Sequence, residues 1–230
     1  MNPQWFQQRR GDMSGAMRLT VRTGVLSGAI AVVWLVFAAF ALASETTDQV
    51  KTELDHLTGI VKDPALQEKA KEEARKSMVK GRIVRWFDLQ EMARRSLASH
   101  WAKRSVEQRK DFVELFGDLF VESYTTLVVD HLGDQQVTYL SEKIDGRDTI
   151  VSTKFLSKRN EPTFVDFALL RRGSAWVPYD VVIDEVSIVG NYRTQFDKVI
   201  RDKSYEDLVK KMRLKREAEE LGSTAKKGSM

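Results

Sequence analysis

The chain has 230 residues, enough for one domain with appendages, and its 42% hydrophobic and 30% charged content is typical of a globular protein. It contains no cysteine, which excludes disulfides, thiol catalysis and cysteine-ligated zinc, and its three histidines match no metal-ligand spacing. Most of the net charge of +4 comes from four arginines in residues 1–43, so the nearly neutral remainder gives little reason to expect nucleic-acid binding.

Residues 1–43 have the layout of a secretory signal peptide. Arg18 and Arg22 precede an uncharged, mostly apolar run, which ends in the small-x-small pattern Ala41-Leu42-Ala43 that signal peptidase needs. The sequence therefore predicts export with cleavage after Ala43. An uncleaved anchor over Thr23–Ser44 is the alternative, because about 20 such residues can span a bilayer. The arginines hold the N-terminus inside in both cases, so the body of the protein faces outward.

The first part of the mature chain is expected to be helical. A Lys- and Glu-rich helical pattern extends from Thr46 to Val79, and Asp63-Pro64 divides it into two helices, the second beginning at Pro64. Two capping-box patterns then mark further helix starts. They are Asp88 with Glu91, and Ser105 with Gln108.

The helix that begins after Ser105 carries the longest apolar stripe, with offsets of three and four residues, and is expected to be the centre of the core. It should end near Gly133, which can adopt the left-handed cap conformation. The stripe consists of Phe112, Leu115, Phe116, Leu119, Phe120, Tyr124, Leu127 and Val128.

Beyond this helix the apolar period changes to two, and short turns favour a sequential antiparallel meander. The four predicted strands are Gln135–Lys143, Arg147–Ser157, Thr163–Arg171 and Ala175–Asp184. Pro178 cannot donate a backbone hydrogen bond, so the fourth strand should be an edge there or carry a bulge. A split helix over Tyr192–Leu221 and a disordered tail over 222–230 complete the chain. The apolar face of the sheet consists of Val137, Tyr139, Val151, Phe155, Val165, Phe167, Leu169, Val177, Tyr179, Val181 and Ile183.

The predicted architecture is α+β, with helices covering one face of a curved four-stranded antiparallel sheet. The helix stripe and the sheet face either pack together as a filled core or stay apart and enclose an apolar cavity, and the pattern fits both. No phosphate-binding loop or hydrolase motif is present. Asp166, Asp180 and Asp184 alternate away from the apolar face, so we interpret them as a solvated outer surface. Acid/base catalysis by Asp166 or Asp180 is the alternative.

Three segments, in order and at matching spacing over roughly residues 83–212, resemble the MlaC-type (toluene-tolerance) family of periplasmic lipid-transfer proteins. They are FDLQEMARRSLASHW, SVEQRKDFVELFGDLFVESYTTLV and WVPYDVVIDEVSIVGNYRTQF. The resemblance implies an NTF2-like fold over residues 44–221 whose apolar cavity takes up the acyl chains of a phospholipid. It also implies a periplasmic carrier that moves lipid between the inner and outer membranes and maintains outer-membrane lipid asymmetry. The implied partners are an inner-membrane ABC transporter with an MCE-domain subunit and an outer-membrane lipoprotein complex.

The cavity should need only apolar contact, so no catalytic residue, metal or cofactor is expected. The alternatives are a carrier of a hopanoid or another amphipathic lipid, an NTF2-like enzyme on an apolar substrate, and a scaffold protein with a filled core. Arg193 either meets a lipid phosphate or is an ordinary surface charge. Glu185 stands where the family usually has glycine, the default residue for a positive φ. The expected lipid-binding residues are Phe112, Phe116, Phe120, Tyr124, Val151, Phe155, Phe167, Val181 and Ile183, with Tyr192 and Arg193 at the mouth.

Overall fold

The structure is a computed structural model that describes the backbone of residues 29–228 and the side chains of residues 45–219 and 221. The chain divides into two compact units, Met1–Ala38 and Ala39–Met230, and the second contains the whole of the sheet. The predicted signal peptide, residues 1–43, lies outside the residues whose side chains are described, and its cleavage stays a prediction. Within the described part of the chain, no helix is both long enough and apolar enough to cross a membrane.

Within residues 29–228, helices come before and after the sheet. The last helix continues to Gly228, although residues 222–230 are predicted to be a disordered tail. The helices are α1 (Ala29–Lys62), α2 (Glu72–Trp86), α3 (Leu89–Leu97), α4 (Val106–His131), α5 (Ile188–Asp202) and α6 (Tyr205–Gly228). They are joined in part by short 3-10 helices: η2 (Pro64–Leu66), η3 (Lys69–Lys71), η4 (Ala98–Lys103) and η5 (Leu132–Asp134).

The predicted helix start at Pro64 is wrong, because Pro64 begins only the turn η2, and α2 starts at Glu72. Polar side chains hold this turn by bonding to nearby backbone. The Asp63 carboxylate accepts a hydrogen bond from the backbone N–H of Ala65 at 2.8 Å, and the Gln67 amide donates to the carbonyl oxygen of Val61 at 2.5 Å. Such bonds compete with the helical pattern and delay the next helix.

Both predicted helix starts are confirmed, but only the second has the full capping box. The Asp88 carboxylate accepts from the backbone N–H of Glu91 at 2.9 Å, at the start of α3. At the start of α4, Ser105 and Gln108 form the full reciprocal capping box. The expected left-handed cap at the far end of α4 is wrong, because Gly133 has no positive φ. A Cβ at Gly133 would lie 3.0 Å from the side chain of Val61, so this glycine permits a close approach to α1 instead.

The sheet is the predicted antiparallel meander, but it has five strands rather than four, in the order β1-β2-β3-β4-β5. The strands are β1 (Gln136–Asp145), β2 (Asp148–Leu156), β3 (Pro162–Arg172), β4 (Ala175–Ile183) and β5 (Val186–Ser187). Val151, Phe167 and Val181 lie side by side across β2, β3 and β4. Pro178 lies at the predicted irregularity, since the register shifts there and leaves Tyr179 as the extra residue.

The fifth strand follows a two-residue connection at Asp184 and Glu185, whose φ angles are +45° and +70°. Positive φ at both central residues is the condition of a type I′ hairpin turn. Glu185 thus adopts the conformation that glycine favours. A left-handed backbone costs a residue with a Cβ roughly 1–2 kcal/mol.

Replacing Glu185 by glycine should therefore raise the free energy of unfolding by about 1 kcal/mol, because the strain disappears while the turn is kept. Glu185→Ala is the matched control, since it removes the same carboxylate and keeps the Cβ. Urea unfolding followed by circular dichroism measures both. Equal changes in the two variants, or a loss of stability in Glu185→Gly, would contradict a left-handed turn at this position.

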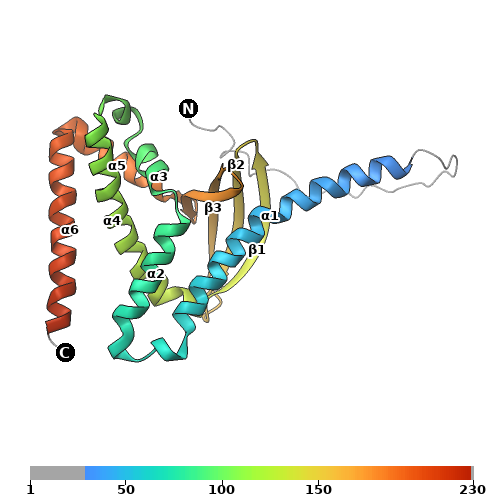
Figure 1. Ribbon diagram of the computed structural model, residues 1–230, viewed down its shortest axis with the longest axis horizontal. Coiled ribbons are helices and arrows are strands. Elements are labelled where there is room, and N and C mark those ends of the chain that lie inside the picture. Colours follow the sequence, from blue (N-terminus) through green and yellow to red (C-terminus); the bar gives the residue numbers. More distant parts are fainter. Residues whose placement is uncertain (1–28, 229–230) are drawn as a thin grey trace. The chain divides into compact units, whose positions relative to one another are not determined.

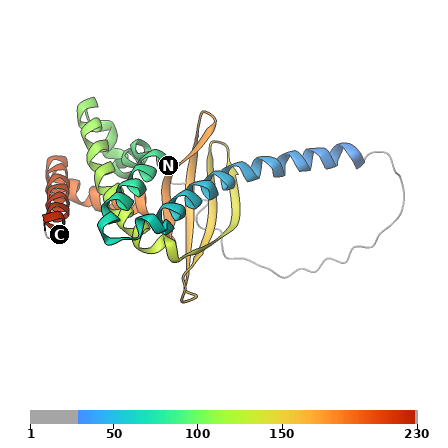
Figure 2. The same ribbon diagram turned by 60° about the horizontal axis from the view of Figure 1, so that its bottom comes forward.

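The helices α2 to α6 gather on one side of the sheet (Figure 2). Figure 1 shows α4 between α2 and α6, in agreement with the contacts between these helices. The first half of the predicted α4 stripe is buried, from Phe112 to Phe120. The second half differs: the buried residues are Val121, Thr125 and Val129, whereas Leu127 is 43% exposed. The buried positions in this half of α4 are thus shifted by one residue from the predicted stripe. The helix α2 packs against α4.

Candidate functional site

Aromatic side chains form a continuous network from the sheet to the last helix. Neighbouring ring centroids lie between 4.6 and 6.5 Å apart, within the range of favourable aromatic pairs. The ring of Phe120 joins the rings near the sheet to the rings between the helices. The ten described members are Trp86, Phe87, Phe112, Phe116, Phe120, Tyr124, Phe167, Tyr192, Phe196 and Tyr205.

At the sheet end, three of the predicted lipid-binding residues form one buried row. Val151 is fully buried, and its cross-strand neighbour Phe167 is also buried, as is Val181, which pairs with Phe167. The Phe167 ring lies 5.4 Å from the ring of Trp86 on α2. The predicted apolar face of the sheet therefore points toward the helices at this row.

At the other end, Phe112 and Phe116 pack among helices. The Phe112 ring lies 5.7 Å from Phe196 on α5 and 6.3 Å from Tyr205 on α6, and the Phe116 ring lies 5.3 Å from Tyr192. The structure thus brings Phe112, Phe116 and Tyr192 together where α4, α5 and α6 meet. Among the described rings, their partners are all on helices rather than on the sheet.

The remaining predicted apolar residues, Tyr124, Phe155 and Ile183, are half-buried. Burial raises the pKa of the Tyr124 phenol above its ordinary value, with smaller contributions from Tyr192 and Asp180. Burial also raises the pKa of Tyr139, a residue of the same predicted sheet face, to about 12. Both hydroxyls therefore lie in weakly polar surroundings while their side chains keep some exposed surface.

Asp180, which alternation along the strand assigns to a solvated surface, does not face water freely. One carboxylate oxygen accepts from the Ser187 hydroxyl at 2.5 Å, and the other accepts from the backbone N–H of Val189 at 3.0 Å. The Ser187 hydroxyl in turn accepts from the N–H of Gly190 at 2.8 Å. Asp180 and Ser187 together cap the start of α5, and an acid is favourable at that position of a helix.

Burial raises the pKa of Asp180, although the hydrogen bonds from Ser187 and Val189 oppose the shift. A raised folded-state pKa means that, between the ordinary and the raised value, the folded state holds more protons than the unfolded chain. Stability contributed by this group then falls as the pH rises through that window.

Asp180→Asn removes this titration. The free energy of unfolding of the wild type minus that of the variant should therefore decrease as the pH rises through the window. Asp197→Asn is the control with the opposite sign, because a hydrogen bond from His100 lowers the pKa of Asp197. Urea unfolding across the acidic pH range measures both slopes. A difference for Asp180 that stays flat or rises with pH would contradict the burial of its carboxyl group.

Asp166 and Asp184 complete the predicted acids. Asp166 pairs with Ser152 and Val182 on the sheet face opposite Phe167. The Asp184 carboxylate accepts from the backbone N–H of Phe164 at 2.9 Å and so extends the pairing of β3. Among the described residues, no three His, Asp or Glu side chains lie close enough together to hold a metal ion.

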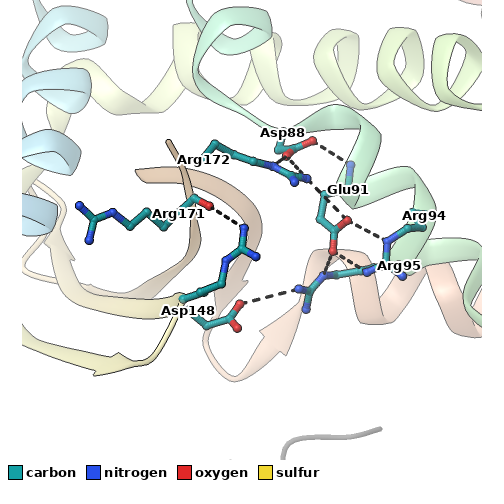
Figure 3. A network of polar contacts seen from close by, with 8 residues as sticks. Asp88, Glu91, Arg94, Arg95, Asp148, Arg171 and Arg172 are labelled. Atoms are coloured by element: carbon teal, nitrogen blue, oxygen red, sulfur yellow. Dashed lines mark hydrogen bonds and ion pairs between the residues drawn. The ribbon is translucent and has the colours of Figure 1, made fainter. Parts of the chain in front are cut away.

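A charged network anchors α3 to the sheet (Figure 3). Glu91 is only 8% exposed; it accepts from Arg94 at 2.5 Å and from Arg95 at 2.7 Å. Burial alone would raise the pKa of Glu91, but the hydrogen bonds from these arginines hold the pKa below its ordinary value. Asp88 pairs with Arg172 of β3 at 2.9 Å. These contacts fix the end of α3 that lies beside the sheet.

Sequence reasoning finds the cap at Asp88 but misses its link to the sheet, because Asp88 and Arg172 lie 84 residues apart in the chain. Arg95 also lies over the Tyr179 ring, 3.7 Å from the centroid. Tyr179 is the extra residue at the bulge of β4. The bulge predicted from Pro178 is therefore the only sequence signal that points to this part of the strand. Arg193 lies elsewhere: it is exposed and lines a hollow beside η4.

Comparison with known proteins identifies a matching family and a solved structure with a similar fold. A family model described as MlaC protein matches residues 51–214. No curated protein matches the chain. The solved structure of a phospholipid-binding protein from Ralstonia solanacearum, in complex with a phospholipid, superposes with a TM-score of 0.64 at 22% sequence identity, over 76% of this chain and 98% of that chain. At this identity the likeness shows a common fold.

Proposed function

Because the chain belongs to the MlaC family, we propose that it is a phospholipid carrier that buries acyl chains against the apolar face of its sheet. The observation that carries the proposal is the buried row Val151, Phe167 and Val181, which faces the helices and continues into the aromatic network. The phospholipid held by the Ralstonia solanacearum protein of the same fold supports it. Acyl chains need such cover, because each exposed methylene costs about 0.8 kcal/mol in water.

The half-buried residues on this face are the ones that a bound chain would cover. Phe155 and Ile183 extend the buried row along β2 and β4. Tyr124 of α4 is also half-buried, and its ring lies 4.6 Å from that of Phe120. Apolar side chains that keep exposed surface in the protein gain most from contact with an acyl chain. Phe112 and Phe116, by contrast, hold the helices together, so they support the site without forming its wall.

The carrier acts in the periplasm and moves lipid between the two membranes, a proposal supported by the layout of residues 1–43 and by the family. Its proposed partners are an inner-membrane ABC transporter with an MCE-domain subunit and an outer-membrane lipoprotein complex. A chain-burying site needs no reactive group, so the protein is a binding protein rather than an enzyme. A hopanoid or another amphipathic lipid is the alternative cargo.

A transfer assay tests the proposal. Donor vesicles carry a self-quenched fluorescent phospholipid, acceptor vesicles carry none, and the protein should raise the rate of dequenching in proportion to its concentration. Thin-layer chromatography of the vesicles afterwards should show intact lipid. The absence of any acceleration would contradict the carrier function, and a hydrolysed product would favour the enzymatic alternative.

A further inference from the structure

A second feature lies on the outer side of α5, away from the aromatic network. Tyr192 and Phe196 of this helix contact the Phe116 ring, whereas Arg193, Asp197 and Arg201 lie on another face. Between that face and η4 is a hollow of about 380 Å³. Its lining residues are Ala98, Ser99, His100, Arg193, Thr194, Asp197, Lys198 and Arg201.

The charges around the hollow are unbalanced. Asp197 is its single acid, and this carboxylate is already engaged by the His100 ring at 2.9 Å and by the Arg201 guanidinium at 3.2 Å. Arg193 and Lys198 are exposed at the hollow, and neither forms an ion pair with any described residue. Two positive side chains therefore face one small space with no carboxylate left to neutralise them.

The polar groups of the hollow are mostly donors. An arginine guanidinium and a lysine ammonium donate hydrogen bonds and accept none. The Ser99 hydroxyl can also donate, whereas the Thr194 hydroxyl already donates to the carbonyl oxygen of Gly190 at 3.1 Å. A ligand that fits must be anionic and rich in acceptor oxygens, which is the chemistry of a phosphate group.

The backbone beside these donors is strained. Ala98 has φ +48° and ψ −119°, a conformation that residues with a Cβ rarely adopt. Strain of this kind persists only where the surrounding structure holds it, and it often occurs beside ligands. The unusual backbone of Ala98 ends α3. The next two residues, Ser99 and His100, line the hollow opposite α5.

We propose that the hollow between η4 and α5 binds a phosphate group, with Arg193 and Lys198 as its principal ligands and Ser99 as a further donor. The phosphate belongs either to a phospholipid headgroup at a membrane surface or to a free phosphate ion. The site does not depend on the carrier function, because it lies outside the aromatic network and its ligand is bound by charge.

Inorganic phosphate is the first probe. Titration of the full chain, followed by amide chemical shifts, should move the signals of Ser99, His100 and residues 193–201. The variant R193Q/K198Q should weaken this binding at least about tenfold, since charge-assisted hydrogen bonds to both side chains are lost. The control R159Q/K211Q removes the same two charges from exposed positions that do not line the hollow, and should bind phosphate as the wild type does.

Vesicles distinguish the two sources. If the headgroup is the ligand, co-sedimentation with phosphatidylglycerol vesicles falls in R193Q/K198Q but not in the control, and inorganic phosphate competes. If free phosphate is the ligand, the titration result holds while co-sedimentation is equal in all three proteins. The proposal is overturned if phosphate moves no signal at the hollow, or if the control loses binding as much as R193Q/K198Q does.

Discussion

Replacing Phe120 by alanine is expected to lower the free energy of unfolding by about 3–5 kcal/mol, the usual cost of deleting a buried phenylalanine ring. Phe120 is 1% exposed. Its ring lies 5.4 Å from Phe87, 6.1 Å from Phe116 and 4.6 Å from Tyr124. Among the described rings it is the one that joins the group near the sheet to the group between the helices. Its loss therefore removes contacts on both sides and leaves a cavity between them.

Phe164→Ala is the matched control, because Phe164 is also a phenylalanine but is 52% exposed on the opposite face of the sheet. Its replacement should change the free energy of unfolding by no more than about 0.5 kcal/mol. Urea unfolding monitored by circular dichroism measures both variants. If Phe120→Ala costs no more than this control, the aromatic network is not the core of the protein.

The variant Phe155→Asp is expected to lose bound phospholipid almost completely, with a fall in affinity of roughly 100-fold or more. An aspartate here would have to be buried under the acyl chain without a partner, at a cost of several kcal/mol, and each 1.4 kcal/mol is a factor of ten. Phe155 is half-buried without lipid and continues the row of Val151 along β2. Its replacement should therefore affect binding of lipid more than folding.

The same substitution on the other side of the sheet provides the control. Phe164 of β3 pairs with Lys154, one residue from Phe155, but lies on the opposite face. Phe164→Asp should keep the lipid content of the wild type. Phospholipid is quantified per mole of purified protein, and circular dichroism verifies that both variants are folded. Equal lipid loss in both, or none in Phe155→Asp, would remove Phe155 from the proposed site.

The strands and the central helix could be predicted from the sequence because local periodicity determines them. The period-two segments give β1 to β4 within a few residues, since side chains alternate between the faces of a strand. Pro178 marks the irregularity of β4 because it has no N–H to donate. The capping box of Ser105 and Gln108 likewise depends on residues three positions apart.

Features that depend on distant partners could not be predicted. Alternation correctly separates Asp180 from the apolar face, but it cannot show that the start of α5 lies there and binds the carboxylate. The stripe of α4 identifies buried residues without showing which element covers each one; the ring of Phe112, for example, meets rings of α5 and α6. The two-residue strand β5 is too short to have a period.

The most direct test of the carrier function is native mass spectrometry of the protein purified from cells without added lipid, followed by extraction and identification of what it carries. The account predicts a mass increase equal to one phospholipid per chain, and a phospholipid as the main extracted species. Protein that is reproducibly free of lipid, and takes up none from vesicles, would contradict it.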